Sequence, residues 1–491
     1  MLTLLVLVFP LAAGLVALVV PWRPWVGWVA AGADAVVLAP GIALAVTTSR
    51  GHVQHSLGGA VRADALSAFM VLVIGAITTL AAIQSVRYLR IEREADRCTD
   101  RHASLYAVLV QVFVTCMLGA VLAANLGVLW VAVEATTIAT TFLVGHRRTD
   151  GALEASWKYV VLCSVGIALA FLGTVLVYFA AIHPGGGPSV AHGVGTLNWT
   201  SLMAIAKHLD PNVMRLAMAL LVLGYGTKVG LAPMHSWLPD AHSQAPAPVS
   251  ALMSGVLLTV AFYALLRFKA IADAALGPAF PRTLLVVVGL ASLLAAASLL
   301  IAQRDYKRML AYSSIEHMGL LALGAAAGST LAIAAVLLHI LGHGLTKAVL
   351  FLTSGEIHQA EHTSEIATVG SLLARRPALG GIFGVGILAI VGFPPFSLFI
   401  SEFTMFRAEA DAGLWWVVVV ALGCLCVIFA AMAGHSRRLL LGDPDDGTVA
   451  VATPRSVVAP LVTALVACAV IGVVAWPLQS LLHAAARVVA P

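Results

Sequence analysis

Long apolar runs follow one another along the whole sequence, separated by short segments that carry the charges, glycines and prolines. Hydrophobic residues make up 60% of the 491 residues and charged residues only 10%, with a mean hydropathy of +0.98. Soluble domains carry about 25% charged residues, so a soluble enzyme is excluded. Since a transmembrane helix takes about 20 apolar residues, the composition predicts an all-α, polytopic integral membrane protein of about 14 transmembrane helices.

The interruptions between the apolar runs divide the chain into four expected regions. Helices 1–3 fall in residues 1–102, a first repeat with helices 4–8 in 103–270, a second repeat with helices 9–13 in 271–435, and a last helix in 436–491. The expected spans lie near residues 2–20, 27–47, 64–88, 103–123, 125–144, 155–182, 213–237, 246–268, 283–302, 308–327, 330–354, 379–406, 414–434 and 457–481.

The distribution of positive charge predicts an orientation. Lysine and arginine are more frequent in the odd-numbered loops, as in the segment from Arg87 to Arg101, than in the even-numbered loops. Cytoplasmic loops carry such an excess, so we expect a bacterial plasma (inner) membrane protein with both termini external. The first apolar run, Leu2 to Val20, has no basic segment before it and no small-residue cleavage site, which favours a first helix over a signal peptide.

Neither the cysteines nor the charged segments indicate a bound group. The six cysteines contain no CxxC pair, which disfavours an iron–sulfur cluster or a structural zinc. No GxGxxG opens a βαβ unit and no haem-like histidine pairs face each other, so a quinone- or hydride-handling membrane enzyme is the weaker alternative. The net charge of +5 is spread over short loops, which does not suggest nucleic acid. We expect no cofactor, no metal and no catalytic residue in this chain.

Charged residues inside the apolar runs are the clearest sign of function. A charge at the centre of a transmembrane helix costs about 2.5–3.5 kcal/mol, so such residues are kept for a reason. His339, His343 and Lys347 recur every four residues and therefore share one face of one helix. Alternating Glu, Lys and His side chains suit a proton relay, whereas the alternative is a set of ion pairs that lock helix packing. The residues concerned are Glu134, Lys228, Glu316, His317, His339, His343, Lys347 and Glu402.

Two spans are expected to be broken by proline next to these charges. Pro233 follows Lys228 by five residues, and Pro394 and Pro395 precede Glu402. Broken helices in corresponding halves of a chain are typical of transporters built from inverted repeats. Asp64, at the start of the third span, is expected to cap that helix rather than to take part in a relay.

Three motifs carry a resemblance to a known family. They are residues 228–242 (KVGLAPMHSWLPDAH) followed by 245–252 (APAPVSAL), residues 307–314 (KRMLAYSS) and residues 343–348 (HGLTKA). They resemble the proton-conducting antiporter-like membrane subunits of respiratory complex I, multi-subunit cation/proton antiporters and group 4 [NiFe] hydrogenases. Residues 313–319 (SSIEHMG) and 154–159 (EASWKY) are most similar to component F of hydrogenase-4.

The resemblance implies roles for individual residues. Glu134 and Lys228 would form the input pair, with Glu134 tuning the proton affinity of the lysine. The central relay would consist of His339, His343 and Lys347, and Glu402 would be the terminal acid. Accessory positions on the proton path would be Lys158, Ser254, Glu316 and His317. Two positions depart from the family pattern: Ser254 stands where some relatives have histidine, and Thr259 where others have a bridging lysine.

The resemblance also implies an assembly. The chain would be a proton-translocating, non-catalytic subunit of a hydrogenase-type oxidoreductase complex, driven by electron transfer in nickel–iron and iron–sulfur partner subunits. One alternative is a subunit of complex I or of a cation/proton antiporter. Another is a structural membrane anchor that has lost transport, which the departures at Ser254 and Thr259 keep open.

Overall fold

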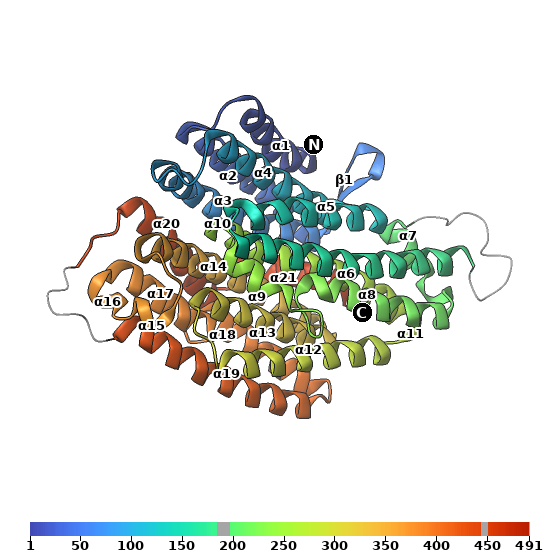
Figure 1. Cartoon of the computed structure of the whole chain (residues 1–491). Coiled ribbons are helices and arrows are strands. Elements are labelled where there is room, and N and C mark those ends of the chain that lie inside the picture. Colours follow the sequence, from blue (N-terminus) through green and yellow to red (C-terminus); the bar gives the residue numbers. More distant parts are fainter. Residues whose placement is uncertain (184–196, 443–449, 491) are drawn as a thin grey trace.

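The computed structural model describes residues 1–183, 197–442 and 450–490, and it is almost entirely helical. Eleven helices within these residues are long and apolar enough to cross a membrane. The helices lie side by side in a broad bundle, and the chain passes through it from the N-terminal helices to α19 on the opposite flank (Figure 1). The prediction of an all-α polytopic membrane protein is confirmed. The number of 14 spans and the inverted repeats stay predictions.

The first part of the chain contains three helices and the only β-hairpin of the described residues. Strands β1 and β2 pair antiparallel, with Gln54 opposite Ala63. Asp64 caps the next helix as expected, because its carboxylate accepts a hydrogen bond from the Ser67 N–H at 3.0 Å. The elements are α1 (Leu2–Val19), α2 (Pro24–Ser49), β1 (Gln54–Ser56), the short η1 (Leu57–Gly59), β2 (Val61–Ala63) and α3 (Ala65–Glu94).

The second part contains the first broken helix. Helix α8 ends one residue after Lys228, and the chain resumes as α9 at Trp237. The exposed backbone groups of the break find partners: the Trp237 indole donates to the Thr227 carbonyl at 2.9 Å. The elements are α4 (Asp100–Leu122), α5 (Leu126–Val144), η2 (Gly145–Arg147), α6 (Asp150–Ile182), α7 (Trp199–Ile205), η4 (Ala206–His208), α8 (Pro211–Val229), α9 (Trp237–Gln244), α10 (Ala247–Leu252), the π-helical turn η5 (Met253–Leu257) and α11 (Leu258–Leu276).

The third part contains the second broken helix, at the expected proline pair. Helix α17 ends at Ile390 and α18 begins at Ser397, so residues 391–396 form a non-helical break shortly before Glu402. The elements are α12 (Ala279–Leu300), α13 (Tyr306–Ala327), α14 (Thr330–Glu361), α15 (Ile366–Val369), α16 (Leu372–Arg375), α17 (Pro377–Ile390) and α18 (Ser397–Asp411).

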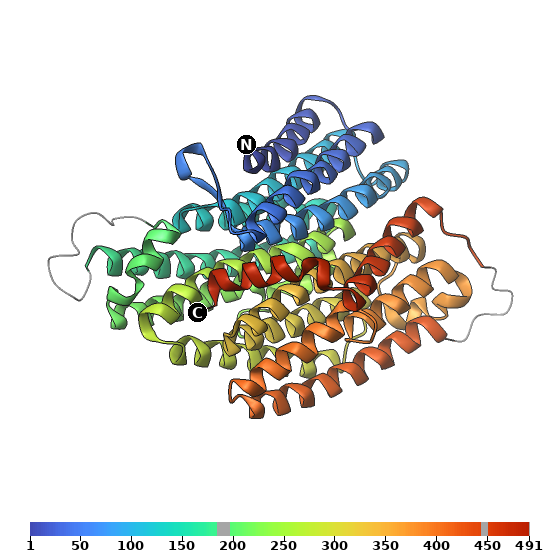
Figure 2. The same cartoon turned by 180° about the vertical axis from the view of Figure 1, so that it is seen from behind.

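The C-terminal helices return the chain across the bundle. They are α19 (Trp415–Leu441), α20 (Arg455–Val473) and α21 (Trp476–Val489). Helix α21 packs against α3 and α14, and Figure 2 shows it lying across the back of the bundle. Both termini lie toward the end of the bundle that carries β1 and α7 (Figures 1 and 2). Which side of the membrane this end faces stays a prediction.

Two helices form the interior, and they position the candidate site. The most apolar stretches of the α10–α11 segment and of α14 are completely buried, whereas α19 and α20 expose most of theirs, as lipid-facing helices do. Where these two buried segments meet, Gly255 and Gly344 face each other. A Cβ on Gly344 would lie 2.9 Å from the Gly255 carbonyl oxygen, so the absence of side chains permits this close approach.

Candidate functional site

Lys228 lies at the first helix break with its whole side chain inside the protein. It occupies the last turn of α8, which ends at Gly230 in a left-handed conformation with φ +85°. Its ammonium group donates hydrogen bonds to the Thr137 hydroxyl at 2.9 Å and to the Tyr159 hydroxyl at 2.6 Å. A buried lysine in a membrane protein needs such acceptors, because the unsatisfied charge is costly.

Glu134 reaches this lysine through a hydroxyl. Thr137, one turn further along α5, donates to the Glu134 carboxylate at 3.1 Å and accepts from Lys228. Among the described residues, Glu134 and Lys228 form no direct ion pair within 4.0 Å. The sequence therefore predicts the two members of the pair, and the structure adds the group that joins them.

Lys158 lies away from these buried groups. Its side chain is about half exposed and forms ion pairs with Glu154 at 2.6 Å and with Asp240 at 2.9 Å. The neighbouring Tyr159 occupies the interior position instead, next to Lys228. Sequence analysis missed Tyr159. The only signal for it is its place one residue after Lys158, which puts its side chain about 100° further around the helix.

Serine side chains occupy the region between the two buried lysines. The π-helical turn η5 carries Ser254, whose hydroxyl is 2.8 Å from the hydroxyl of Ser314 on α13. Such turns occur mostly at functional sites. Thr259 is also buried, but its hydroxyl bonds to carbonyl oxygens in its own turn of the chain. Of the two positions that depart from the family pattern, Ser254 is therefore the one that reaches a polar side chain on another helix.

Lys347 is the second completely buried lysine. It donates to the Ser313 hydroxyl at 2.9 Å and to the Leu310 carbonyl at 2.6 Å, both on α13. Glu316, one turn beyond Ser313, is close enough for its charge to interact with that of Lys347. Sequence analysis also missed His242. Its buried ring stacks on Phe351, with 5.0 Å between the ring centroids, and neither of its nitrogens has a partner among the described residues.

Three buried histidines continue from Lys347 toward the second helix break. His339 and His343 lie on α14 as predicted, and His317 on α13 lies between them, with its ring centroid 5.1 Å from each of theirs. His317 Nδ1 is 3.1 Å from His339 Nε2, and His339 Nδ1 is 3.0 Å from the Ser401 hydroxyl. The structure thus gives His317 a central place among the histidines.

Glu402 follows these histidines on α18. Its carboxylate is 4.0 Å from His317 Nδ1, and its side chain is 14% exposed, in contrast to the fully buried histidine. A Cβ on Gly392, in the break, would lie 2.5 Å from the same carboxylate, so the glycine leaves room for it. The sequence predicts Lys347 as the charged neighbour of Glu402. Among the described residues, His317 is the ion-pair partner instead, because α13 lies between the two.

The site as a whole is a series of groups that can each hold and pass on a proton. It runs from α5 and α8 through α13 and α14 to α18, and lysine, hydroxyl, imidazole and carboxyl groups alternate along it. Ligand atoms of His317, His339 and Glu402 lie within 4.8 Å of one another, which a metal ion could also use. The expectation that the chain binds no metal stays a prediction.

Comparisons with known proteins place this geometry among membrane complexes. The family model described as NADH:quinone oxidoreductase/Mrp antiporter, TM, matches residues 123–428. A hydrogenase-4 component F homolog of Methylacidiphilum infernorum is 39% identical over 75% of this chain and 76% of its own length. NADH-quinone oxidoreductase subunit N of Desulforudis audaxviator is 30% identical over 91% of this chain and 88% of its own.

Solved structures share the fold at lower identity. A chain of the archaeal membrane-bound sulfane sulfur reductase matches with a TM-score of 0.86 and 23% identity, covering 99% of this chain and 97% of that one. A chain of the Mrp complex from Dietzia sp. DQ12-45-1b matches with a TM-score of 0.84 and 22% identity, covering 99% and 97%.

Proposed function

We propose that this chain, which belongs to the NADH:quinone oxidoreductase/Mrp antiporter transmembrane family, moves protons across the membrane as one subunit of a larger complex. Electron transfer in partner subunits would drive the movement, and this chain would carry out no covalent chemistry.

The bonding of the two buried lysines is the observation that carries the proposal. Lys228 and Lys347 donate to hydroxyl and carbonyl oxygens, and neither forms an ion pair with a carboxylate among the described residues. Lysines kept only to lock helix packing would be expected to pair with buried acids. A lysine bonded to neutral acceptors can lose its proton without leaving a carboxylate unpaired, which suits transfer.

The residues divide into an input, a relay and an exit. We assign the input to Glu134 and Lys228, with Thr137 and Tyr159 as the hydroxyls beside them. The exit acid is Glu402, at the second break. The relay between them consists of Lys347, His343 and His339, with Ser254, Glu316 and His317 as accessory groups. Lys158 would act only at the surface, where protons enter from water.

Two inverted repeats, in residues 103–270 and 271–435, would account for the paired breaks. Each proposed repeat contains one broken helix with a charged residue beside it, Lys228 at the first and Glu402 at the second. Freed backbone groups at such breaks can be hydrated, which gives protons a route to the buried groups.

The complex that we favour is a group 4 [NiFe] hydrogenase-type oxidoreductase in a bacterial plasma (inner) membrane. The 39% identity to a hydrogenase-4 component F homolog supports it, and nickel–iron and iron–sulfur subunits would be the partners. The second candidate is a subunit of complex I or of a cation/proton antiporter, which the 30% identity to an NADH-quinone oxidoreductase subunit supports. A structural anchor without transport is the third.

Co-purification and transport together test these alternatives. The complex is isolated through this chain, its subunits are identified by mass spectrometry, and proton movement per electron is measured in sealed vesicles. Lys228→Ala and Lys347→Ala should each lower that ratio, whereas Lys207→Ala, which removes an exposed lysine, should not. A nickel–iron subunit in the isolated complex supports the hydrogenase assignment, and a wild-type ratio of zero would leave the anchor.

A further inference from the structure

A cavity rich in arginine opens at the end of the bundle that carries the β-hairpin. Its volume is about 630 Å³, and its walls come from four segments that are distant in the sequence: the end of α2, the hairpin, α7 and α21. Arg50, Arg62 and Arg487 line it, together with the hydroxyl-bearing Thr48, Ser49 and Thr200. We call this the arginine cavity.

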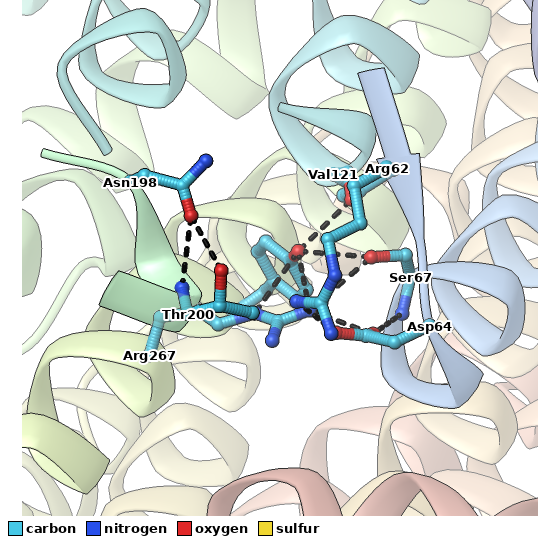
Figure 3. A network of polar contacts seen from close by, with 8 residues as sticks. Arg62, Asp64, Ser67, Val121, Asn198, Thr200 and Arg267 are labelled. Atoms are coloured by element: carbon cyan, nitrogen blue, oxygen red, sulfur yellow. Dashed lines mark hydrogen bonds and ion pairs between the residues drawn. The ribbon is translucent and has the colours of Figure 1, made fainter. Parts of the chain in front are cut away.

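The single acid of the cavity wall is already neutralised from beneath. Asp64 accepts from Arg267 at 2.7 Å and forms an ion pair with Arg62 at 3.2 Å, and Figure 3 shows both guanidinium groups converging on it. Arg267 is almost completely buried and lies under Trp199, 4.7 Å from its ring centroid. One carboxylate therefore faces two arginines, and Arg50 and Arg487 add further positive charge.

Two guanidinium groups at the arginine cavity have hydrogen-bond donors left over. Arg62 Nε and Arg267 Nη1 are buried and have no acceptor among the described residues. A buried donor without a partner costs about 1–3 kcal/mol, and more when the group is charged. Native proteins rarely retain such groups unless a ligand, an ion or water completes them.

We propose that the arginine cavity binds a phosphate group, carried by an anionic phospholipid headgroup or present as free inorganic phosphate. Arginine is well suited to phosphate because its planar guanidinium group donates two parallel hydrogen bonds. The lipid source is favoured because apolar Val53, Met203 and Val488 share the wall with the arginines, as a headgroup with its acyl chains requires. The bound phosphate would tie the hairpin and α7 to the C-terminal helix α21.

Lipid binding to the purified full-length chain tests this proposal. Short-chain phosphatidylglycerol, short-chain phosphatidylcholine and inorganic phosphate are titrated separately into delipidated protein, and binding and thermal unfolding are followed. The wild type should bind phosphatidylglycerol and unfold at a higher temperature when it is present. Because hydrogen bonds to charged groups contribute appreciably to binding, Arg62→Gln and Arg487→Gln should each weaken it about tenfold or more.

Matched variants and the other ligands decide between outcomes. Arg215→Gln removes an exposed arginine at the start of α8 and should bind like the wild type. Arg487→Gln alters only an exposed side chain in the last helix, so it tests the arginine cavity even if Arg62→Gln fails to fold. Equal stabilisation by inorganic phosphate would assign free phosphate in place of lipid. Equal binding of phosphatidylcholine, or unchanged binding in both variants, would overturn the proposal. Since proton movement is not measured, this result does not depend on the proposed transport function.

Discussion

Lys228 and Glu134 are joined through one hydroxyl group rather than by direct contact. The Lys228 ammonium donates to Thr137 at 2.9 Å, and the same hydroxyl donates to the Glu134 carboxylate at 3.1 Å. Thr137 therefore transmits the charge of the lysine to the acid, since a hydroxyl both donates and accepts. This bridge makes the threonine a residue through which the proposed input pair can be tested.

We expect Thr137→Val to weaken proton movement while the protein still assembles. The valine has nearly the same shape but cannot bridge the two charges, so about 1.5–3 kcal/mol of charge-assisted bonding is lost, which corresponds to about tenfold or more in rate. Thr137→Ser should retain most of the activity. Initial rates of proton uptake into sealed vesicles measure the effect.

The matched control for this prediction is Thr141→Val, one turn further along α5. The Thr141 hydroxyl donates to the Thr137 carbonyl of its own helix, so its loss should leave transport near the wild-type rate. Equal rates for Thr137→Val and the wild type would show that the two charges communicate by another route.

Glu402→Gln should abolish proton movement, because the terminal position then has no group that exchanges a proton. Glu402→Asp should retain part of it, since the acid persists but its carboxylate is withdrawn from His317. General acid–base groups contribute about 10²–10⁴-fold, so Glu402→Gln should fall below about a tenth of the wild-type ratio of protons to electrons. Electron transfer in the partner subunits should continue.

Glu409→Gln provides the control for Glu402 on the same helix. Glu409 is also buried, and both of its carboxylate oxygens lack hydrogen-bond partners among the described residues, those of the three histidines included. Its substitution should leave the proton-to-electron ratio unchanged. If Glu402→Gln gives the same ratio as Glu409→Gln, the chain is better described as an anchor.

The ion pair beneath the arginine cavity predicts a dependence of stability on acid. Burial opposes ionisation of Asp64, but Arg267 and Arg62 outweigh it and lower the pKa of its carboxyl group from 3.8 to about 2. A carboxyl group with a lowered pKa stabilises the folded state fully above its unfolded pKa. This stabilisation, about 2 kcal/mol, is lost as the pH falls from about 4 to about 2.

Asp64→Asn should lower the unfolding temperature at pH 7 and remove this acid-dependent step. Asparagine also caps helices, so the substitution removes the charge and leaves the cap of α3. Thermal unfolding in detergent between about pH 7 and about pH 2 measures both effects. Asp210→Asn, which alters the cap of α8, should keep the acid-dependent step. An unchanged step in Asp64→Asn would assign it to another acid.

The predicted orientation can be tested by cysteine labelling in a background without Cys98. Ala490→Cys, at the C-terminal end, should react with a membrane-impermeant reagent added outside intact cells. Ala95→Cys, in the charged segment between α3 and α4, should react only after the cytoplasmic side is opened, because loops rich in arginine stay inside. The reverse pattern would invert the proposed topology.

The sequence by itself determined the class of fold and most of the chemistry. Apolar runs of about 20 residues without water-exposed charges can only satisfy their backbone as helices in a membrane. The four-residue spacing of His339, His343 and Lys347 places them on one helical face, because about 3.6 residues complete a turn. Proline next to Lys228 and before Glu402 correctly predicted both helix breaks, since proline removes a helical hydrogen bond.

Only the tertiary structure decided which side chains meet across helices. Thr137 and Tyr159 beside Lys228, His317 between the histidines of α14, and the placement of Lys158 at the surface all depend on how helices are rotated against one another. Periodicity along one helix contains no information on that rotation, which packing of all the helices fixes together. The arginine cavity has the same origin, because α21 must first return across the bundle before Arg487 can approach Arg62.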